Sequence, residues 1–300
     1  MELNYYTCDV FTRTRFGGNP LAVVPDARGL TTEQMQALAR EFNYSETTFV
    51  LPPQDPQHTR QVRIFTPRIE VPFAGHPNVG TAFMLAALDQ VSMVNEHATL
   101  HFEEKAGLVT VTVARRSQGD VYCELQAPQA LSLGEAVSAD EMAAVVGLAP
   151  GDILTATHEP CVASVGLPFL IAEVSDRAAL ARANPNINAM QALQARGITP
   201  DVHLYTRDGA GFDLRTRMFA PLDGVFEDPA TGSANCALTG LLAHCQPEAE
   251  GDWQWHIAQG VEMGRPSDLY ARVRKQGGAV QTIMMGGFSV RVASGTIRVN

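Results

Sequence analysis

The sequence predicts an α+β protein of two similar halves, each a mostly antiparallel sheet rolled around a central helix. Three observations lead to this prediction. The chain has 300 residues, twice the roughly 150 residues typical of one domain. Two motifs recur in the same order, about half a chain apart. In each half, strand-like alternation of apolar and polar residues is followed by a helix that is apolar on nearly all sides.

The repeat consists of two matched pairs of segments. RIFTP at Arg63–Pro67 recurs as RMFAP at Arg217–Pro221. HPNVGTA at His76–Ala82 recurs as DPATGSA at Asp228–Ala234. The offsets are 217 − 63 = 154 and 228 − 76 = 152 residues, so a short difference in the intervening loop accounts for the mismatch. We therefore expect an internal duplication.

The boundary between the halves is predicted in the proline-containing stretch Gln126–Leu133. This prediction places the first half at residues 1–128 and the second half at residues 129–300. We also expect that the last strand can return to the first half.

Strands are predicted where apolar and polar residues alternate, or where short β-branched runs lie between turn residues. VRIFT from Val62 and LRTRMF from Leu214 alternate in this way directly before the repeated motifs. The other predicted strands are Tyr5–Phe11, Leu21–Val24, Thr48–Leu51, Leu108–Val113, Val121–Leu125, Phe169–Glu173, Leu269–Val273 and Phe288–Val292.

Capping patterns predict three helices on the flanks of the two sheets. Each begins with a residue that can cap a helix and continues with apolar residues at helical spacing. The predicted starts and ends are Thr31 to Phe42, Ser138 to Gly147, and Asn184-Pro185 to Gly197. In the first of these, Thr31 and Gln34 have the spacing of a capping box.

The two central helices begin inside the repeated motif. Proline follows both His76 and Asp228, and proline at the first helical position is pre-organised for a helix start. These two residues are therefore predicted to be N-caps. The residues that follow are apolar on almost every side, which predicts that each helix is buried within its own half. The apolar positions are Ala82, Phe83, Ala86, Ala87, Ala237, Leu238, Leu241 and Leu242.

Composition excludes several classes of protein. The chain has 22 lysine and arginine residues and 32 aspartate and glutamate residues, so its net charge is 22 − 32 = −10. It therefore lacks the positive field that binds nucleic acid. The N-terminus has no apolar segment typical of a signal peptide, and no apolar run approaches the ~20 residues of a membrane span. The five cysteines form no C-x-x-C pair. We expect a cytoplasmic protein that binds neither nucleic acid nor membrane.

No cofactor or metal is predicted. The sequence has no G-x-G-x-x-G after a strand, no phosphate-binding lysine loop, no G-x-S-x-G and no H-E-x-x-H. His97 and His101 are four residues apart, but their segment alternates like a strand and offers no further ligands nearby.

The starts of the two central helices suggest a site. Helix N-termini carry partial positive charge and unsatisfied N–H groups, so Gly75, His76, Gly232 and Ser233 could donate to a substrate carboxylate. Aspartate is an ordinary N-cap, but histidine is a poor one. The change from Asp228 to His76 between the copies therefore suggests an acid and a base for proton transfer, or, for Asp228, simple capping.

Five ordered motifs span most of the chain. They are FGGNPLAVV (Phe16–Val24), NYSETTFV (Asn43–Val50), FTPRIEVPFAGHPNVGTA (Phe65–Ala82), EDPATGSAN (Glu227–Asn235) and QGVEMGRPS (Gln259–Ser267). Together they resemble the PhzF-like phenazine-biosynthesis family, whose namesake is trans-2,3-dihydro-3-hydroxyanthranilate isomerase. The resemblance implies the diaminopimelate-epimerase-like fold, with two similar domains and a site between them, no cofactor, and a possible homodimer.

The resemblance also implies roles for individual residues. It makes Glu46 the catalytic base, a residue that its local pattern alone would class as a solvated loop carboxylate. It adds His76, Asp228 and Ser233 to the catalytic set. The implied substrate-binding residues lining the same cleft are Asn19, Gly75 and Gly232.

The function implied is an isomerase that moves a proton between carbons of a small, cyclic or conjugated, carboxylic acid. Burial in a closed cleft would raise the pKa of Glu46 toward the working pH. Related epimerases use two cysteines at the helix starts, whereas here His76 and Asp228 stand there and Cys236 lies a turn further on. An amino-acid racemase using Glu46 and a non-catalytic binding protein remain open alternatives.

Overall fold

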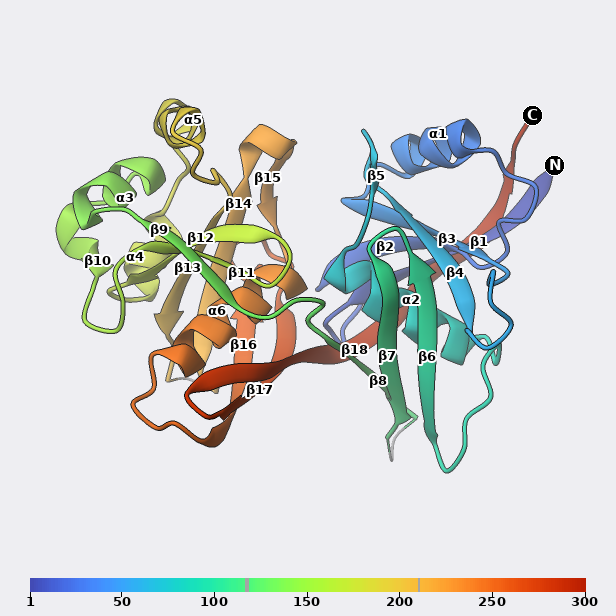
Figure 1. The fold of residues 1–300 in the computed structure, drawn as a ribbon. Coiled ribbons are helices and arrows are strands. Elements are labelled where there is room, and N and C mark those ends of the chain that lie inside the picture. Colours follow the sequence, from blue (N-terminus) through green and yellow to red (C-terminus); the bar gives the residue numbers. More distant parts are fainter. Residues whose placement is uncertain (117–118, 210) are drawn as a thin grey trace. The chain divides into compact units, whose positions relative to one another are not determined.

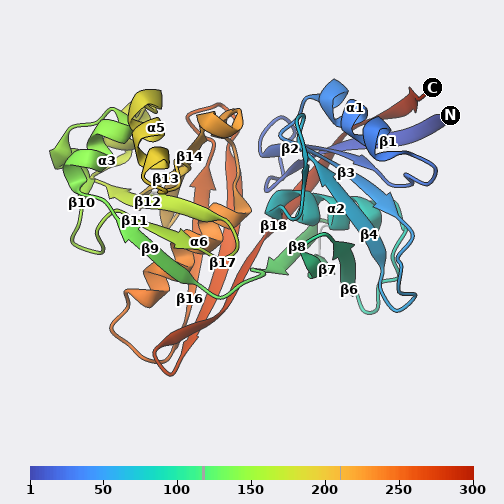
Figure 2. The same cartoon turned by 45° about the horizontal axis from the view of Figure 1, so that its top comes forward.

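The computed structural model describes residues 1–116, 119–209 and 211–300, and they form an α+β fold rich in strands. The chain divides into two compact units (Figures 1 and 2). Unit 1 comprises Met1–Gln126 and Gly286–Asn300, and unit 2 comprises Ala127–Met285. The long strand β18 (Ala279–Arg298) contributes residues to both.

Unit 1 is a sheet that encloses the helix α2. All residues of α2 from Gly75 to Ala86 are buried, and the helix packs against β1, β2, β3, β7 and β8. Its elements are β1 (Glu2–Val10), β2 (Asn19–Val24), α1 (Thr32–Phe42), β3 (Glu46–Leu51), β4 (Arg60–Phe65), β5 (Glu70–Val71), α2 (Gly75–Ala87), β6 (His97–Glu104), β7 (Gly107–Arg115) and β8 (Val121–Gln126).

Unit 2 has its own central helix, α6, which packs against β11, β12 and β17. Two 3-10 turns, Pro150–Asp152 and Pro221–Asp223, lie between its strands. Its other elements are β9 (Ser132–Ala136), α3 (Ala139–Val146), β10 (Ile153–Leu154), β11 (Cys161–Ser164), β12 (Pro168–Val174), α4 (Arg177–Arg182), α5 (Ile187–Ala195), β13 (Val202–Arg207), β14 (Leu214–Ala220), β15 (Val225–Asp228), α6 (Gly232–His244), β16 (Gly251–Gln259) and β17 (Ser267–Gln276).

The two units follow the same series of strand pairings. In unit 1, β1 and β2 are antiparallel, β2 and β3 parallel, and β3 and β4 antiparallel; β4 then pairs antiparallel with β5 and parallel with β6. In unit 2, β11 to β16 repeat these relations in the same order. The helix that precedes the last parallel strand is α2 in one unit and α6 in the other.

The starts of the two central helices differ from the prediction. The N-caps are Ala74 and Thr231, not His76 and Asp228. His76 is the second residue of α2, and Asp228 is the last residue of β15. The reason is that the proline following Asp228 lies in the loop before α6, whereas the proline following His76 lies within the first turn of α2.

Aligning the two units on the first residues of their central helices gives a different offset from that of the sequence motifs. With the first helical residues aligned, the offset is 232 − 75 = 157 residues, so His76 corresponds to Ser233. Asn78 then corresponds to Asn235, and each donates its side-chain amide to the carbonyl of the N-cap residue of its helix, at 3.0 Å.

The flanking helices follow their capping signals closely. The Thr31 capping box is present, and Ser138 caps α3, which ends at Gly147. The third helix starts later than predicted, because the side chain of Asn186 and not Asn184 accepts from the helix. Helix α4 was not predicted.

Candidate active site

The first group of site residues lies in unit 1, around the start of α2. Glu46 is the first residue of β3 rather than part of a loop, and its side chain is 18% exposed. Its Oε2 lies 3.5 Å from Nε2 of His76, whose side chain is 5% exposed. On the other side of the ring, Nδ1 of His76 lies 3.3 Å from Nδ2 of the buried Asn19. The structure therefore brings Glu46, His76 and Asn19 together.

These contacts fix the form of the histidine. Ser45 Oγ donates to Asn19 Oδ1 at 3.1 Å, so the amide nitrogen of Asn19 faces the imidazole. An amide nitrogen only donates, which makes Nδ1 of His76 the acceptor and leaves the ring proton on Nε2, toward Glu46.

Burial fixes the charge of the same ring. Desolvation lowers the pKa of His76 from 6.5 to about 3, so the imidazole is neutral near pH 7. Glu46 Oε2 and His76 Nε2 therefore lie 3.5 Å apart without forming an ion pair, because the imidazole is neutral.

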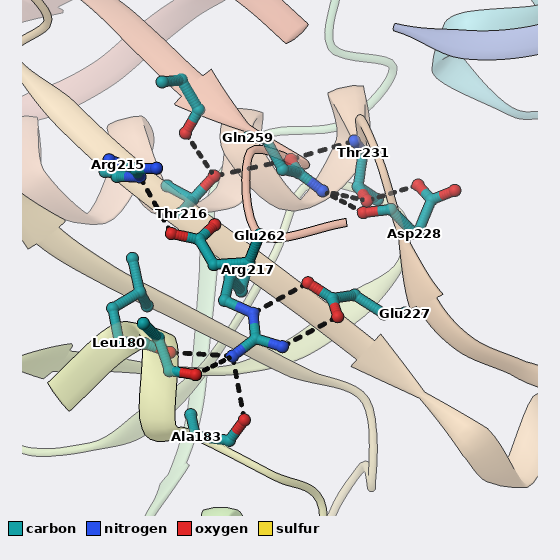
Figure 3. Close-up of polar contacts among 12 residues, drawn as sticks. Leu180, Ala183, Arg215, Thr216, Arg217, Glu227, Asp228, Thr231, Gln259 and Glu262 are labelled. Carbon is teal, nitrogen blue, oxygen red and sulfur yellow. Dashed lines mark hydrogen bonds and ion pairs between the residues drawn. The ribbon is translucent and has the colours of Figure 1, made fainter. Parts of the chain in front are cut away.

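The second group of site residues lies in unit 2, where β15 ends and α6 begins (Figure 3). Asp228 is 8% exposed, and its Oδ2 accepts a hydrogen bond from Thr231 Oγ1 at 2.5 Å. Gln259, which is fully buried, donates from Nε2 to the carbonyl of Asp228 at 2.8 Å and to Thr231 Oγ1 at 3.0 Å. Asp228 is therefore held by both its backbone and its side chain.

The remaining predicted residues occupy the first positions of the two central helices. Gly75 and Gly232 are the first residues of α2 and α6, and both are buried. Ser233 is the second residue of α6. The unsatisfied N–H groups expected in the first turn of a helix lie at these positions, which suit a carboxylate.

Sequence analysis missed the residues that hold the predicted ones. Thr231 and Gln259 lie inside the family motifs, but their sequence context indicates no role for them, and Ser45 stands out only as the neighbour of Glu46. Gln259 contacts residues 28 and 31 positions away in the chain. No local spacing reveals such contacts, and the only signal is the presence of QGVEMGRPS in a matched motif.

The QGVEMGRPS segment supports the Asp228 loop in two further ways. Ser267 Oγ donates to the carbonyl of Pro229 at 2.8 Å. Gly260 has φ +72, and a Cβ there would lie 2.6 Å from the Pro229 carbonyl oxygen, so only glycine fits this turn.

The thiols are unsuited to proton transfer. Burial raises the pKa of Cys236 to about 12 and also raises the pKa of Cys8 and Cys123, which keeps all three protonated. Across residues 1–116, 119–209 and 211–300, no three His, Cys, Asp or Glu side chains gather in a way that could hold a metal ion. Within these same ranges, no helix has the length and apolar character needed to cross a membrane.

Comparison of the sequence with known proteins identifies its relatives. The model of the PhzC-PhzF family, described as phenazine biosynthesis-like protein, matches residues 8–295. An uncharacterised isomerase of Mesorhizobium japonicum is 40% identical over 98% of both chains. The trans-2,3-dihydro-3-hydroxyanthranilate isomerase of Pseudomonas aeruginosa is 37% identical over 97% of this chain and 98% of that relative.

Solved structures agree on the fold. A phenazine biosynthesis protein of the PhzF family from Bacillus anthracis has a TM-score of 0.89 over the whole of both chains, at 24% identity. A hydroxyproline epimerase from Agrobacterium vitis has a TM-score of 0.65 over 99% of this chain and 92% of that chain, at 14% identity. The fold is therefore epimerase-like, and the family match over nearly the whole sequence shows that this chain belongs to the phenazine biosynthesis-like protein family.

Proposed function

We propose that this protein is a cofactor-independent isomerase that moves a proton between two carbons of a small cyclic or conjugated carboxylic acid, with Glu46 as the base. The observation that carries the proposal is the 3.5 Å approach of Glu46 Oε2 to Nε2 of the buried, neutral His76. Relatives named trans-2,3-dihydro-3-hydroxyanthranilate isomerase support the reaction type.

The chemistry follows from the charge of the two side chains. A carboxylate next to an imidazolium would be held in an ion pair and would be a weaker base. Next to a neutral N–H donor, Glu46 can accept the proton of a C–H bond while the bonding electrons enter the conjugated system of the substrate. The protonated Glu46 then returns the proton to a different carbon. The double bond shifts, no electrons are gained or lost, and both side chains regain their starting state.

We assign the substrate carboxylate to the helix starts. N–H groups at Gly75, His76, Gly232 and Ser233 can donate to an anion without a counter-charge from lysine or arginine. We propose that Asp228 orients the substrate or stabilises charge during the reaction, and that Ser233 is a hydrogen-bond donor.

We also propose that the two units arose by duplication. The shared series of strand pairings supports this, as do two equivalent contacts. Arg63 pairs with Glu70 in unit 1, and Arg217 pairs with Glu227 in unit 2, each through two hydrogen bonds of 2.7–2.8 Å. In this register, His76 and Ser233 are equivalent, so one ancestral helix start has acquired two different functional side chains.

Proton exchange in D2O tests the proposed reaction. The protein is incubated with trans-2,3-dihydro-3-hydroxyanthranilate and with a panel of unsaturated cyclic carboxylic acids and amino acids, and products are analysed by mass spectrometry and NMR. We expect a product whose double bond has moved, with deuterium wherever the proton held by Glu46 exchanges with the solvent before it is returned. Deuterium at Cα with loss of chirality would instead identify a racemase. Neither exchange nor a shifted double bond with any compound would count against the isomerase and favour a binding protein.

A further inference from the structure

The residue at the N-cap position of α6 makes no capping hydrogen bond with its side chain. Thr231 is the N-cap of this helix, but its side chain accepts no hydrogen bond from the first turn. A threonine at this position ordinarily accepts from the second or third N–H of its helix. Here its hydroxyl turns away and donates to Oδ2 of Asp228 at 2.5 Å.

Gln259 determines the direction of that hydrogen bond. Its Oε1 accepts from the backbone N–H of Thr231 at 3.1 Å and from Nδ2 of Asn235 at 2.7 Å, so the orientation of its amide is fixed. Its Nε2 therefore faces Thr231 Oγ1 at 3.0 Å (Figure 3). An amide nitrogen only donates, so the threonine oxygen accepts this bond and its own hydrogen points to the carboxylate.

The rest of this polar group is anchored in the interior of unit 2. Asn235 Oδ1 lies 3.1 Å from Nε2 of the buried His203, and Asn235, His203 and Gln259 are each fully buried. A network of this kind holds its members in one arrangement, because each bond lost inside the protein would leave a buried polar atom unsatisfied. The Thr231 hydroxyl is therefore held by the interior on one side and faces Asp228 on the other.

Unit 1 lacks the corresponding hydroxyl. The N-cap of α2 is Ala74, which is equivalent to Thr231 at the offset of 157 residues. At the corresponding helix start of unit 1, Asn78 donates to the carbonyl of Ala74, and at this position the described residues contain no hydroxyl that its neighbours could direct to a carboxylate. The arrangement that directs a hydroxyl to a carboxylate is thus specific to the unit that contains Asp228.

We propose that Thr231, held by Gln259, is a positioning residue that orients the Asp228 carboxylate for its part in the reaction. This inference rests on the proposed function, since it matters for turnover only if Asp228 acts on the substrate. Residues that hydrogen-bond metal-ligating side chains typically contribute about 10–100-fold to activity, and we expect an effect of this order for the bond between Thr231 and Asp228.

Two substitutions of Thr231 test the proposal. Thr231→Val removes the hydroxyl and keeps the shape, whereas Thr231→Ser keeps the hydroxyl. With trans-2,3-dihydro-3-hydroxyanthranilate as substrate, we expect Thr231→Val to lower kcat about 10–100-fold with little change in KM, and Thr231→Ser to retain most of the activity. Thr231→Val should also lower Tm by several °C, because Gln259 Nε2 and the Asp228 carboxylate each lose a hydrogen bond, whereas Thr231→Ser should leave Tm close to that of the parent protein.

A second measurement reports on Asp228 without any substrate. In protein labelled with 13C at the aspartate carboxyl carbons, the Asp228 signal is identified by its loss in Asp228→Asn. The Thr231 hydroxyl donates to the charged carboxylate, so its removal should move the titration of this signal to higher pH in Thr231→Val and not in Thr231→Ser.

The outcomes separate this inference from the proposed function. An unchanged Asp228 titration in Thr231→Val would overturn the positioning role, whatever the activity. Normal turnover by Asp228→Asn would instead contradict the proposed role of Asp228, while the titration would still show whether Thr231 orients it. If Asp228→Asn is inactive and Thr231→Val turns over as fast as the parent protein, Thr231 has no part in positioning for catalysis.

Discussion

At the scale of single residues, the central feature is a carboxylate next to a histidine that burial keeps neutral. A neighbouring side chain and burial determine this. Asn19 donates to one ring nitrogen of His76, and desolvation lowers the pKa of the ring to about 3. His76 is thus unsuited to be the acid that supplies a proton at neutral pH, and its Nε2–H is suited to stabilise negative charge on Glu46 or on the substrate. The proposed mechanism therefore gives the role of base to Glu46 and the role of hydrogen-bond donor to His76.

Glu46→Gln tests the assignment of the base. The substitution keeps the size of the side chain and removes its capacity to accept a proton, so turnover should fall by about 10³-fold or more, several kcal/mol of transition-state stabilisation. Steady-state kinetics and thermal melts are the measurements, and Tm should stay close to that of the parent protein. Glu41→Gln, at an exposed glutamate near the end of α1, is the control and should be fully active. Near-normal turnover by Glu46→Gln would mean that another residue is the base.

A buried carboxyl in unit 1 makes stability depend on pH. Desolvation raises the pKa of Glu104 from 4.5 to about 8, so the folded protein keeps a proton that the unfolded chain loses. This contribution to stability is complete below about pH 4.5 and is lost as pH rises toward 8. Glu104→Gln, which keeps the size of the side chain and removes the titrating carboxyl, should raise Tm by about 2–4 °C at pH 8.5 and change it less at pH 5. An equal change at both pH values in thermal melts would show that the carboxyl is not protonated in the fold.

The site can be predicted from the sequence only in part, and the reason is physical. Glu46 and His76 stand in motifs that resemble a family, so the sequence alone is enough to identify them as candidates. The capping role predicted for Asp228 is wrong, because a proline after a capping residue is equally compatible with a loop. Thr231 and Gln259 escape recognition, since their contact joins two distant segments that no local pattern connects.

At the scale of elements, predictions succeeded where the signal was local. The helices α1 and α3 carry their caps within four residues of sequence, and both caps are present. Helix α4 has six residues, too few to show a helical period. Strand β13 was missed because buried His203 and Thr206 interrupt its apolar pattern, and Nε2 of His203 lies 3.1 Å from Oδ1 of Asn235 on a different element. Helix α4 is thus too short for a periodic signal, and in β13 a tertiary contact accommodates a polar residue that the local pattern would exclude.

The side chain of Arg217 connects β14, on which it lies, to β15 and to the end of α4. Arg217 on β14 is 8% exposed and makes two hydrogen bonds of 2.8 Å to Glu227 on β15. Its Nη1 also donates to the carbonyls of Leu180 and Ala183 at the end of α4, at 2.8 and 2.9 Å (Figure 3). These acceptors are arranged for a planar guanidinium with several donors, which an ammonium group does not reproduce.

Arg217→Lys should therefore destabilise the protein although it conserves charge. We expect a loss of about 2–4 kcal/mol in the free energy of unfolding, because buried acceptors lose their donors. Arg274→Lys is the matched control: Arg274 also pairs with a carboxylate, Asp252, but both side chains are more than 60% exposed. Its change should be within about 0.5 kcal/mol. Similar losses for the two variants in urea denaturation would show that the carbonyl contacts of Arg217 contribute nothing.

At the scale of the whole molecule, unit 1 consists of an N-terminal and a C-terminal segment of the chain. Strand β1 pairs with the second part of β18 from Glu2↔Arg298 to Val10↔Ser289, and with β2 on its other side. Unit 2, by contrast, is one continuous segment, residues 127–285. A continuous unit with its own core should fold alone, whereas residues 1–126 alone would leave β1 without one of its two neighbours and expose a long strand edge.

The position of the termini offers a way to test this organisation. Met1 N donates to the carbonyl of Val299 at 2.7 Å, and Val299 N donates to the carbonyl of Met1 at 2.9 Å, so the end of β18 and the start of β1 are antiparallel neighbours. A short Asn-Gly turn can join such ends into a hairpin. Unit 1 can then be made as one chain in the order 286–300, turn, 1–126.

We expect this rearranged chain and the isolated segment 127–285 each to unfold cooperatively, while residues 1–126 alone should be unfolded or aggregated. Circular dichroism during thermal melts and the dispersion of amide signals in NMR spectra distinguish these states. The control is the same rearranged chain with Val290→Pro, which removes a backbone donor within the strand paired with β1 and should abolish folding. Cooperative folding of residues 1–126 without the C-terminal strand would show that β18 is dispensable for unit 1. Failure of both single-chain units to fold would show that the two cores are stable only within one chain.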